Sequence, residues 1–179
     1  MSRVRSFAPV SAPDATRLIL GSMPGALSLA DAQYYAHPQN AFWRIAGALF
    51  DFDPALPYAQ RCDALRAAGV ALWDVLGECV RPGSLDSAIV EASIEANDLA
   101  GFLDAHPSIG LICFNGAKAE QSFARHVLPH VSERHRSIPR HRLPSTSPAH
   151  AGMRFDAKLA CWRAVLLPPA ALPNDCAPR

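Results

Sequence analysis

The sequence predicts an α/β fold, a three-layer α/β/α sandwich with a central, mostly parallel four-stranded sheet. Short apolar runs alternate with longer segments of helical periodicity, which is the pattern of parallel strands covered by helices on both faces. The chain has 179 residues, of which 50% are hydrophobic and 18% are charged, a composition typical of one globular domain. No internal repeat and no linker rich in Gly or Ser divides it. We therefore expect a single domain over residues 1–169 and a disordered tail over residues 170–179.

Each expected strand is a short apolar run that ends at turn residues. The strands are expected at Arg17–Gly21, Val70–Asp74, 109–115 and, in a shorter form, 140–144. Segments of helical periodicity lie between and after them, at 41–50, 58–68, 94–105, 117–127 and 155–167. Ser93 is a candidate N-cap for the third of these helices, and Pro168 ends the last one.

Composition excludes several classes of protein. No apolar run reaches the roughly 18 residues of a membrane-spanning helix, and the first residues lack the apolar core of a signal peptide, so we expect a cytoplasmic protein with no membrane partner. Five cysteines are scattered without a CxxC or Cys/His cluster, which argues against a disulfide framework and against zinc or iron–sulfur sites. The segment GSMPG at 21–25 is neither GxGxxG nor a P-loop. We expect no metal and no cofactor.

The net charge of +1 conceals one basic stretch, residues 125–142, which holds five arginines against one glutamate. A local charge of this sign suits a partner that carries phosphate, although a solvated basic loop is an equal alternative. Arg140 and Arg142, in the last expected strand, are the candidate phosphate contacts.

In an open α/β sheet the ligand site lies beyond the carboxyl ends of the strands. Each expected strand ends in polar or turn-forming residues, and we expect the site to be assembled from four places: Gly21-Ser22-Met23-Pro24-Gly25, Trp73-Asp74, Phe114-Asn115-Gly116 and Leu143-Pro144-Ser145-Thr146-Ser147-Pro148. Glycine at both ends of the first segment allows a tight turn whose main-chain N–H groups can approach a ligand.

An aromatic-rich segment at residues 34–43 follows the first turn and reads YYAHPQNAFW. Aromatic faces stack nucleic-acid bases, which makes Tyr35 and Phe42 candidates for contact with a base. Burial of these rings in the core is the alternative, and the segment alone does not decide between the two.

The run GSMPG, followed by SL and QYYAHPQNAFWR, resembles the first motif of the uracil-DNA glycosylase superfamily, and specifically of its hypoxanthine-DNA (deoxyinosine) glycosylase branch. The resemblance continues through GVALWDVL, GSLDSAI, CFNG and LPSTSP, and so spans roughly residues 18 to 162. It implies a monofunctional DNA glycosylase that flips out a deaminated base, chiefly hypoxanthine, and hydrolyses its N-glycosidic bond in base excision repair. The implied partner is double-stranded DNA containing such a base, bound by a monomer.

Two positions depart from the better-known relatives. Met23 stands where mismatch-specific enzymes carry Asn and the most efficient uracil enzymes carry Asp, and Leu143 stands where many uracil enzymes carry His. In the hypoxanthine branch the catalytic role belongs to the Asn of the HPxN segment, which is Asn40 here. A neutral amide cannot take a proton at neutral pH, so Asn40 would orient a water molecule rather than deprotonate it. The resemblance therefore does not imply high efficiency on uracil.

The same alignment implies the residues that bind the base. Asp74 stands where relatives read the base with Asn, and an ionised carboxylate there would accept the ring N–H of hypoxanthine or uracil. Capping of local backbone is the alternative for Asp74, and ordinary turn chemistry is the alternative for Asn115. The other candidates could stabilise charge on the departing base through N–H groups or hydroxyls, and they are Gly21, Ser22, Met23, Ser145 and Ser147.

Pro148, Ala149 and His150 occupy the place where superfamily members insert a loop into the duplex, and small apolar wedges suit that task. His150 would contact phosphate or the opposite base, or be inert. Lys118 and Lys158 fall within expected helices, so we expect no Schiff base and no strand-cleaving lyase activity.

Two alternative functions stay open at this point. One is a mismatch-specific uracil-DNA glycosylase, and the other is a DNA-damage binding module without turnover. The presence of Asn40 together with the YYAHP segment argues against the binding module, whereas Met23 keeps it possible.

Overall fold

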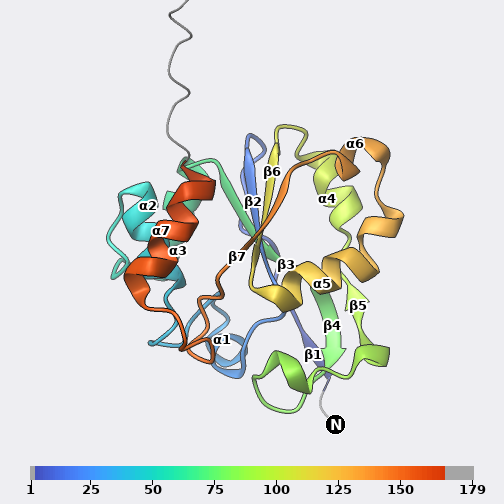
Figure 1. Ribbon diagram of the computed structural model, residues 1–179, viewed down its shortest axis with the longest axis horizontal. Coiled ribbons are helices and arrows are strands. Elements are labelled where there is room, and N and C mark those ends of the chain that lie inside the picture. Colours follow the sequence, from blue (N-terminus) through green and yellow to red (C-terminus); the bar gives the residue numbers. More distant parts are fainter. Residues whose placement is uncertain (1–2, 168–179) are drawn as a thin grey trace, which may run out of the picture.

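The central sheet of the computed structural model, which describes residues 3–167, follows the predicted strands closely (Figure 1). β3 (Val70–Asp74), β2 (Arg17–Gly21), β6 (Leu111–Asn115) and β7 (Arg140–Leu143) pair in that order, and every pair is parallel. The prediction of a mostly parallel four-stranded sheet is therefore confirmed.

Helices cover both faces of this sheet (Figure 1). α2 (Phe42–Phe50), α3 (Tyr58–Ala67) and α7 (Phe155–Leu166) lie on one face. α4 (Leu99–Ala105), α5 (Ala117–His126) and the short α6 (Glu133–Arg136) lie on the other. Successive residues of β2 serve the two cores in turn, because side chains alternate along a strand: Leu18 and Leu20 pack in one core and Ile19 in the other. All three side chains are at most 1% exposed.

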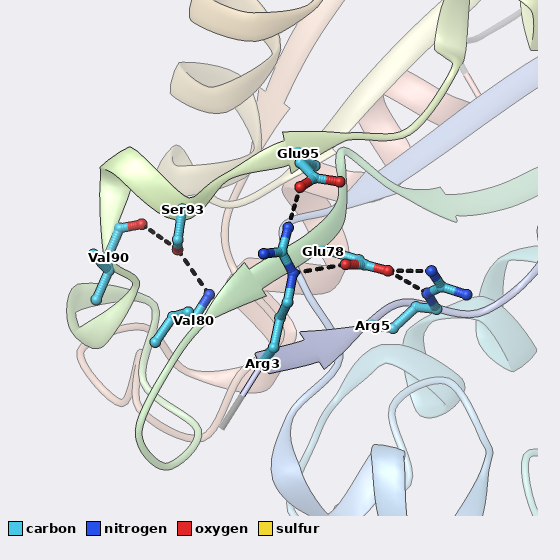
Figure 2. Close-up of polar contacts among 7 residues, drawn as sticks. All are labelled: Arg3, Arg5, Glu78, Val80, Val90, Ser93 and Glu95. Carbon is cyan, nitrogen blue, oxygen red and sulfur yellow. Dashed lines mark hydrogen bonds and ion pairs between the residues drawn. The ribbon is translucent and has the colours of Figure 1, made fainter. Parts of the chain in front are cut away.

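A second, antiparallel sheet is not predicted by the sequence. It consists of β1 (Arg3–Arg5), β4 (Leu76–Val80) and β5 (Glu95–Ala96) in the order β1-β4-β5. Figure 2 shows how charged side chains tie it together, with Glu78 between Arg3 and Arg5, and Glu95 bound to Arg3. β1 and β5 are too short and polar to form the apolar run on which strand prediction depends.

The helix expected at 94–105 is shorter than predicted, and Ser93 is not its N-cap. The helix begins at Leu99, where the N-cap Asp98 accepts a hydrogen bond from the Gly101 N–H at 2.9 Å. Ser93 instead ends the 3₁₀ helix η2 (Glu91–Ser93), and its hydroxyl accepts from the Val80 N–H and donates to the Val90 carbonyl (Figure 2). The pairing of β5 with β4 prevents the intervening residues from joining the helix.

Four further elements are absent from the sequence-based prediction: α1 (Ala26–Asp31), η1 (Asp86–Ala88), η3 (Leu128–His130) and the short α6. α1 starts directly after the 21–25 turn, and η1 precedes β5 in the connection from β4. The tail expected at 170–179 lies outside the described residues. Among the residues described, no helix has the length and apolarity needed to cross a membrane.

Candidate active site

A cavity of about 340 Å³ lies at the carboxyl ends of β2, β3 and β6, within the size range of small-molecule sites. All four segments expected at the strand ends contribute to it, together with part of the aromatic-rich segment. Its lining comprises residues 21–28, Tyr34, Tyr35, His37, Asn40, Asp74, residues 84–86, Asn115 and residues 145–150.

The 21–25 turn is anchored through its carbonyl oxygens. The Gly21 and Ser22 carbonyls accept from the N–H groups of Val75 and Leu76, at 2.9 and 3.1 Å. The turn also approaches Asp74 so closely that a Cβ on Gly21 would lie 2.4 Å from Asp74 Oδ1. Glycine at position 21 is therefore required for the carboxyl group to occupy its place.

Residues 84–86 form one wall of the cavity, and the segment 81–86 docks on the turn and on the start of α1 through the side chains of Arg81, Ser84 and Asp86. The guanidinium of Arg81, which is 1% exposed, donates to the Met23 and Pro24 carbonyls. The Ser84 hydroxyl accepts from the Ala26 N–H at 2.9 Å. The Ser22 hydroxyl donates to the Asp86 carboxylate at 2.8 Å. Nothing in the sequence marks Arg81 as part of the site, because its acceptors lie 57 and 58 residues earlier in the chain.

We expect Arg81→Met to lower the free energy of unfolding by several kcal/mol, because each buried carbonyl left unpaired costs about 1–3 kcal/mol. The Arg81 charge also lowers the pKa of both Asp74 and Asp86, so its loss should move the acidic limb of a pH–rate profile to higher pH. Thermal unfolding and base release from pH 5 to 9 measure the two effects.

Two variants control for this prediction. Arg81→Lys keeps the charge and loses the forked geometry, so it should destabilise the protein without the pH shift. Arg66→Met removes a partly exposed arginine of α3 and should change neither quantity. An Arg81→Met protein with wild-type stability and pH profile would show that the contacts do not hold the turn.

Asp74 is buried at the cavity floor, with 3% of its surface exposed. Its Oδ2 accepts from the Ser6 hydroxyl at 2.8 Å, and its backbone carbonyl accepts from the Asn97 amide at 2.9 Å. Burial raises the pKa of Asp74 to about 7, the Ser6 hydrogen bond opposes the rise, and the nearby Asp86 adds to it. Near neutral pH the carboxyl group therefore populates both its protonated form and the ionised form that the sequence analysis invokes for contact with the base.

Asn40 lines the same cavity from the aromatic-rich segment and is half-buried. Its Oδ1 accepts from the Phe42 N–H at 3.0 Å at the start of α2, which fixes the orientation of the amide. The adjacent Ala41 N–H donates to the Thr146 carbonyl at 3.0 Å and ties this segment to the 145–150 segment. The Asn40 amide keeps its NH₂ group and one lone pair of Oδ1 for a ligand or a water molecule.

Tyr35 and Phe42 stack on each other, with ring centroids 4.2 Å apart and an interplanar angle of 23°. Tyr35 lines the cavity, whereas Phe42 is 0% exposed and belongs to the core beneath α2. The expectation that Phe42 contacts the base is therefore wrong. Its ring supports Tyr35 from behind.

The polar residues of the other two strand ends brace the cavity wall. Asn115 donates through Nδ2 to the Thr146 hydroxyl at 2.8 Å and accepts through Oδ1 from the Thr146 N–H at 2.9 Å. The Ser145 hydroxyl accepts from the Ser147 N–H, and the Ser147 hydroxyl accepts from the Ala149 N–H. These contacts agree with a positioning role for Asn115 and shape the loop that carries both serines.

The predicted DNA contacts fall into two groups. Pro148, Ala149 and His150 are exposed at the rim of the cavity, and the His150 carbonyl accepts from the buried Lys158 of α7 at 2.9 Å. Arg140 and Arg142 are exposed on β7 and do not line the cavity. Arg140 donates to the Arg136 carbonyl, and Arg142 pairs with Glu120 at 3.3 Å. Within residues 3–167, no three His, Cys, Asp or Glu side chains gather closely enough to hold a metal ion.

Comparison with known proteins agrees with this geometry. The family model of the uracil DNA glycosylase superfamily matches residues 8–166. A hypoxanthine DNA glycosylase of Methanosarcina barkeri is 37% identical over 116 residues, which are 64% of this chain and 72% of that protein. A hypoxanthine DNA glycosylase of Methanosarcina acetivorans is 35% identical over 147 residues, which are 77% of this chain and 92% of that protein.

A solved structure is also similar. It is the solution NMR structure of a candidate uracil DNA glycosylase from Methanosarcina acetivorans, with a TM-score of 0.77 and 32% sequence identity, and the match covers 92% of this chain and 97% of that one. The resemblance inferred from the motifs is thus confirmed, and the chain belongs to the uracil DNA glycosylase superfamily.

Proposed function

We propose that this protein is a monofunctional DNA glycosylase that hydrolyses the N-glycosidic bond of deaminated bases in duplex DNA, chiefly hypoxanthine. The observation that carries the proposal is that Asn40 and Asp74, from separate segments, line one cavity at the carboxyl ends of the parallel strands. The names of the two Methanosarcina relatives support hypoxanthine as the base. We further propose that the protein acts as a monomer in the cytoplasm.

The substrate nucleotide must first leave the duplex, which costs a few kcal/mol and least for a mispaired base. The exposed residues at 148–150 lie at the rim of the cavity, where a wedge would fill the gap that the flipped nucleotide leaves. Hypoxanthine presents a ring N–H beside a carbonyl. The ionised form of Asp74 accepts that N–H and disfavours adenine, which presents a bare ring nitrogen there.

Bond cleavage precedes water attack in this mechanism, because Asn40 can orient a water molecule but cannot deprotonate it. The sugar then passes through an oxocarbenium-like state, and negative charge develops on the departing base. The carbonyls of the 21–25 turn are already bonded to Val75, Leu76 and Arg81. We assign stabilisation of the departing base to the N–H groups of the same turn.

Neither lysine is placed for covalent catalysis. Lys158 donates to the His150 carbonyl and is buried, and Lys118 pairs with Glu91. Because none of the described residues that line the cavity carries an amine nucleophile, the expected product is an intact abasic strand.

The decisive experiment incubates the purified protein with duplexes that carry hypoxanthine, uracil, a thymine mismatch or xanthine, and then cleaves abasic sites with alkali. Fastest release of hypoxanthine, unchanged by excess EDTA and with no strand cleavage before alkali, is the expected result. Faster release of uracil would favour the mismatch-specific uracil enzyme. Tight binding of damaged duplex without release of any base would favour the binding module.

The exposed arginines of β7 give a prediction about DNA affinity. If Arg140 and Arg142 contact phosphates, the double alanine variant should lose affinity for damaged and for undamaged duplexes by a similar factor. The slope of log affinity against log salt should flatten by about 0.9 for each phosphate that the variant no longer neutralises. Titrations at several salt concentrations measure the slope, with Arg66→Ala of α3 as the matched control. An unchanged slope would assign both side chains to solvent and to their local partners, Glu120 and the Arg136 carbonyl.

A further inference from the structure

The hydroxyl group of Tyr35 is buried and has no hydrogen-bond partner in the protein. Buried polar atoms are nearly always paired, so an unpaired one calls for an explanation. Within the described part of the chain, Tyr35 is the only residue with such a side-chain atom that also lines the cavity. An unused donor at a ligand cavity is suited to a ligand.

The backbone holds this tyrosine in a conformation that bulky residues rarely adopt, with φ at 54°. Contacts on both sides keep it there: the Trp43 indole donates to the Tyr34 carbonyl at 2.8 Å, and the Ala36 N–H donates to the Ser28 hydroxyl at 3.1 Å. The stacked ring of Phe42 fixes the plane of the side chain. Strain that the surroundings impose in this way is characteristic of functional positions.

The Tyr35 hydroxyl lies next to Asp74 at the cavity floor. A Cβ built on Gly21 would lie 2.4 Å from Asp74 Oδ1 and 3.0 Å from Tyr35 Oη, so both atoms border the same point. Burial, followed by the charge of Asp74, raises the pKa of Tyr35, so the hydroxyl keeps its proton and remains a donor. Asn115 faces the hydroxyl and lowers that pKa as a donor to the phenol oxygen, while one N–H and one lone pair of its amide bond Thr146, so the phenol proton itself has no acceptor. A donor and an acceptor thus stand side by side without a protein partner for the donor.

We propose that Tyr35 is a specificity-determining residue whose hydroxyl donates a hydrogen bond to the base carbonyl while Asp74 Oδ1 accepts from the neighbouring ring N–H. The inference rests on the proposed function and names the group that recognises the carbonyl of the base, beside the ring N–H that Asp74 recognises. Hypoxanthine and uracil both present a carbonyl beside a ring N–H and satisfy both groups. Adenine and cytosine present an amino group beside a bare ring nitrogen and leave the pair mismatched, which is how sites with buried polar groups discriminate strongly.

The test is Tyr35→Phe, which keeps the aromatic ring and removes only the hydroxyl. Single-turnover release of hypoxanthine and of uracil should each fall about tenfold to a hundredfold, with unchanged affinity for undamaged duplex. The melting temperature should stay the same or rise, because the variant removes an unpaired buried donor. A slower reaction in an equally stable protein is a pattern that a packing role would not produce.

Tyr58→Phe is the matched control, because the Tyr58 hydroxyl lies outside the cavity and accepts from the Tyr34 N–H at 3.1 Å. It should lower the melting temperature and leave the rates of hypoxanthine and uracil release unchanged. A Tyr35→Phe rate within twofold of wild type, or a parallel loss of rate and stability, would overturn the inference. A wild-type protein that releases neither base would instead overturn the proposed function, and the inference with it.

Discussion

Replacing Asn40 with alanine should reduce single-turnover release of hypoxanthine by at least about a hundredfold while duplex binding stays nearly unchanged. Holding a reacting molecule in the correct geometry commonly contributes a factor of about a hundred or more. Asn40 is a half-buried amide in the cavity, and both the sequence motif and the geometry assign it to the reaction. Met23 in the neighbouring turn cannot replace it, because its thioether cannot hold a water molecule as an amide can. Quenched-flow or manual time courses under enzyme excess measure the rate, and filter binding measures the affinity.

The amide also accepts a hydrogen bond from the N–H of Phe42, the first residue of α2, so Asn40→Ala should lose about 1 kcal/mol of stability. That loss needs a control of the same kind. Asp98→Ala removes the side chain that caps α4 and does not line the cavity, and it should cost similar stability with a wild-type rate. If Asn40→Ala releases hypoxanthine as fast as Asp98→Ala, the catalytic assignment is wrong.

The elements that the sequence predicts best are those whose own consecutive residues are apolar and buried in the core. β2 and β3 have the predicted bounds because each is a five-residue strand with four consecutive apolar residues and nearly every residue buried. β1 and β5 carry arginine and glutamate on exposed positions, and they exist because β4 lies between them. A strand that depends on a partner distant in sequence leaves no periodic signal of its own.

The site divides in the same way. Asn40 and Asp74 are predictable because each sits in a motif beside a strand end or an expected helix start. Arg81 and Asp86 are not, since their contacts with the 21–25 turn are visible only once β4 and η1 are folded against it. Phe42 shows the opposite error, because an aromatic at the start of a helix suits both stacking on a base and packing in the core.

The second large effect is expected for Asp74→Asn, which removes a buried charge that lowers the free energy of unfolding. The pKa of Asp74 is raised from 3.8 to about 7 by burial, so the native state holds the proton more tightly than the unfolded chain. The stability that this provides is fully present below pH 4 and is lost as pH rises through 7, by at most about 4 kcal/mol. Asparagine does not titrate, so the melting temperature of the variant should exceed that of wild type at pH 8 and the gap should close toward pH 4.

The same substitution should alter substrate choice. The amide oxygen can still accept the ring N–H of hypoxanthine, but its NH₂ group can also donate to the bare ring nitrogen of adenine, so the ratio of hypoxanthine to adenine release should fall. In wild type, hypoxanthine release should rise through about pH 7 as the acceptor ionises, and this limb should disappear in Asp74→Asn. Single-turnover rates and melting curves from pH 5 to 8.5 give both results. An unchanged ratio of rates with a lower melting temperature at every pH would show that Asp74 serves only to hold Ser6 and the backbone. A residue that recognises the base should behave in the opposite way, because its replacement raises the stability of the protein and lowers its selectivity.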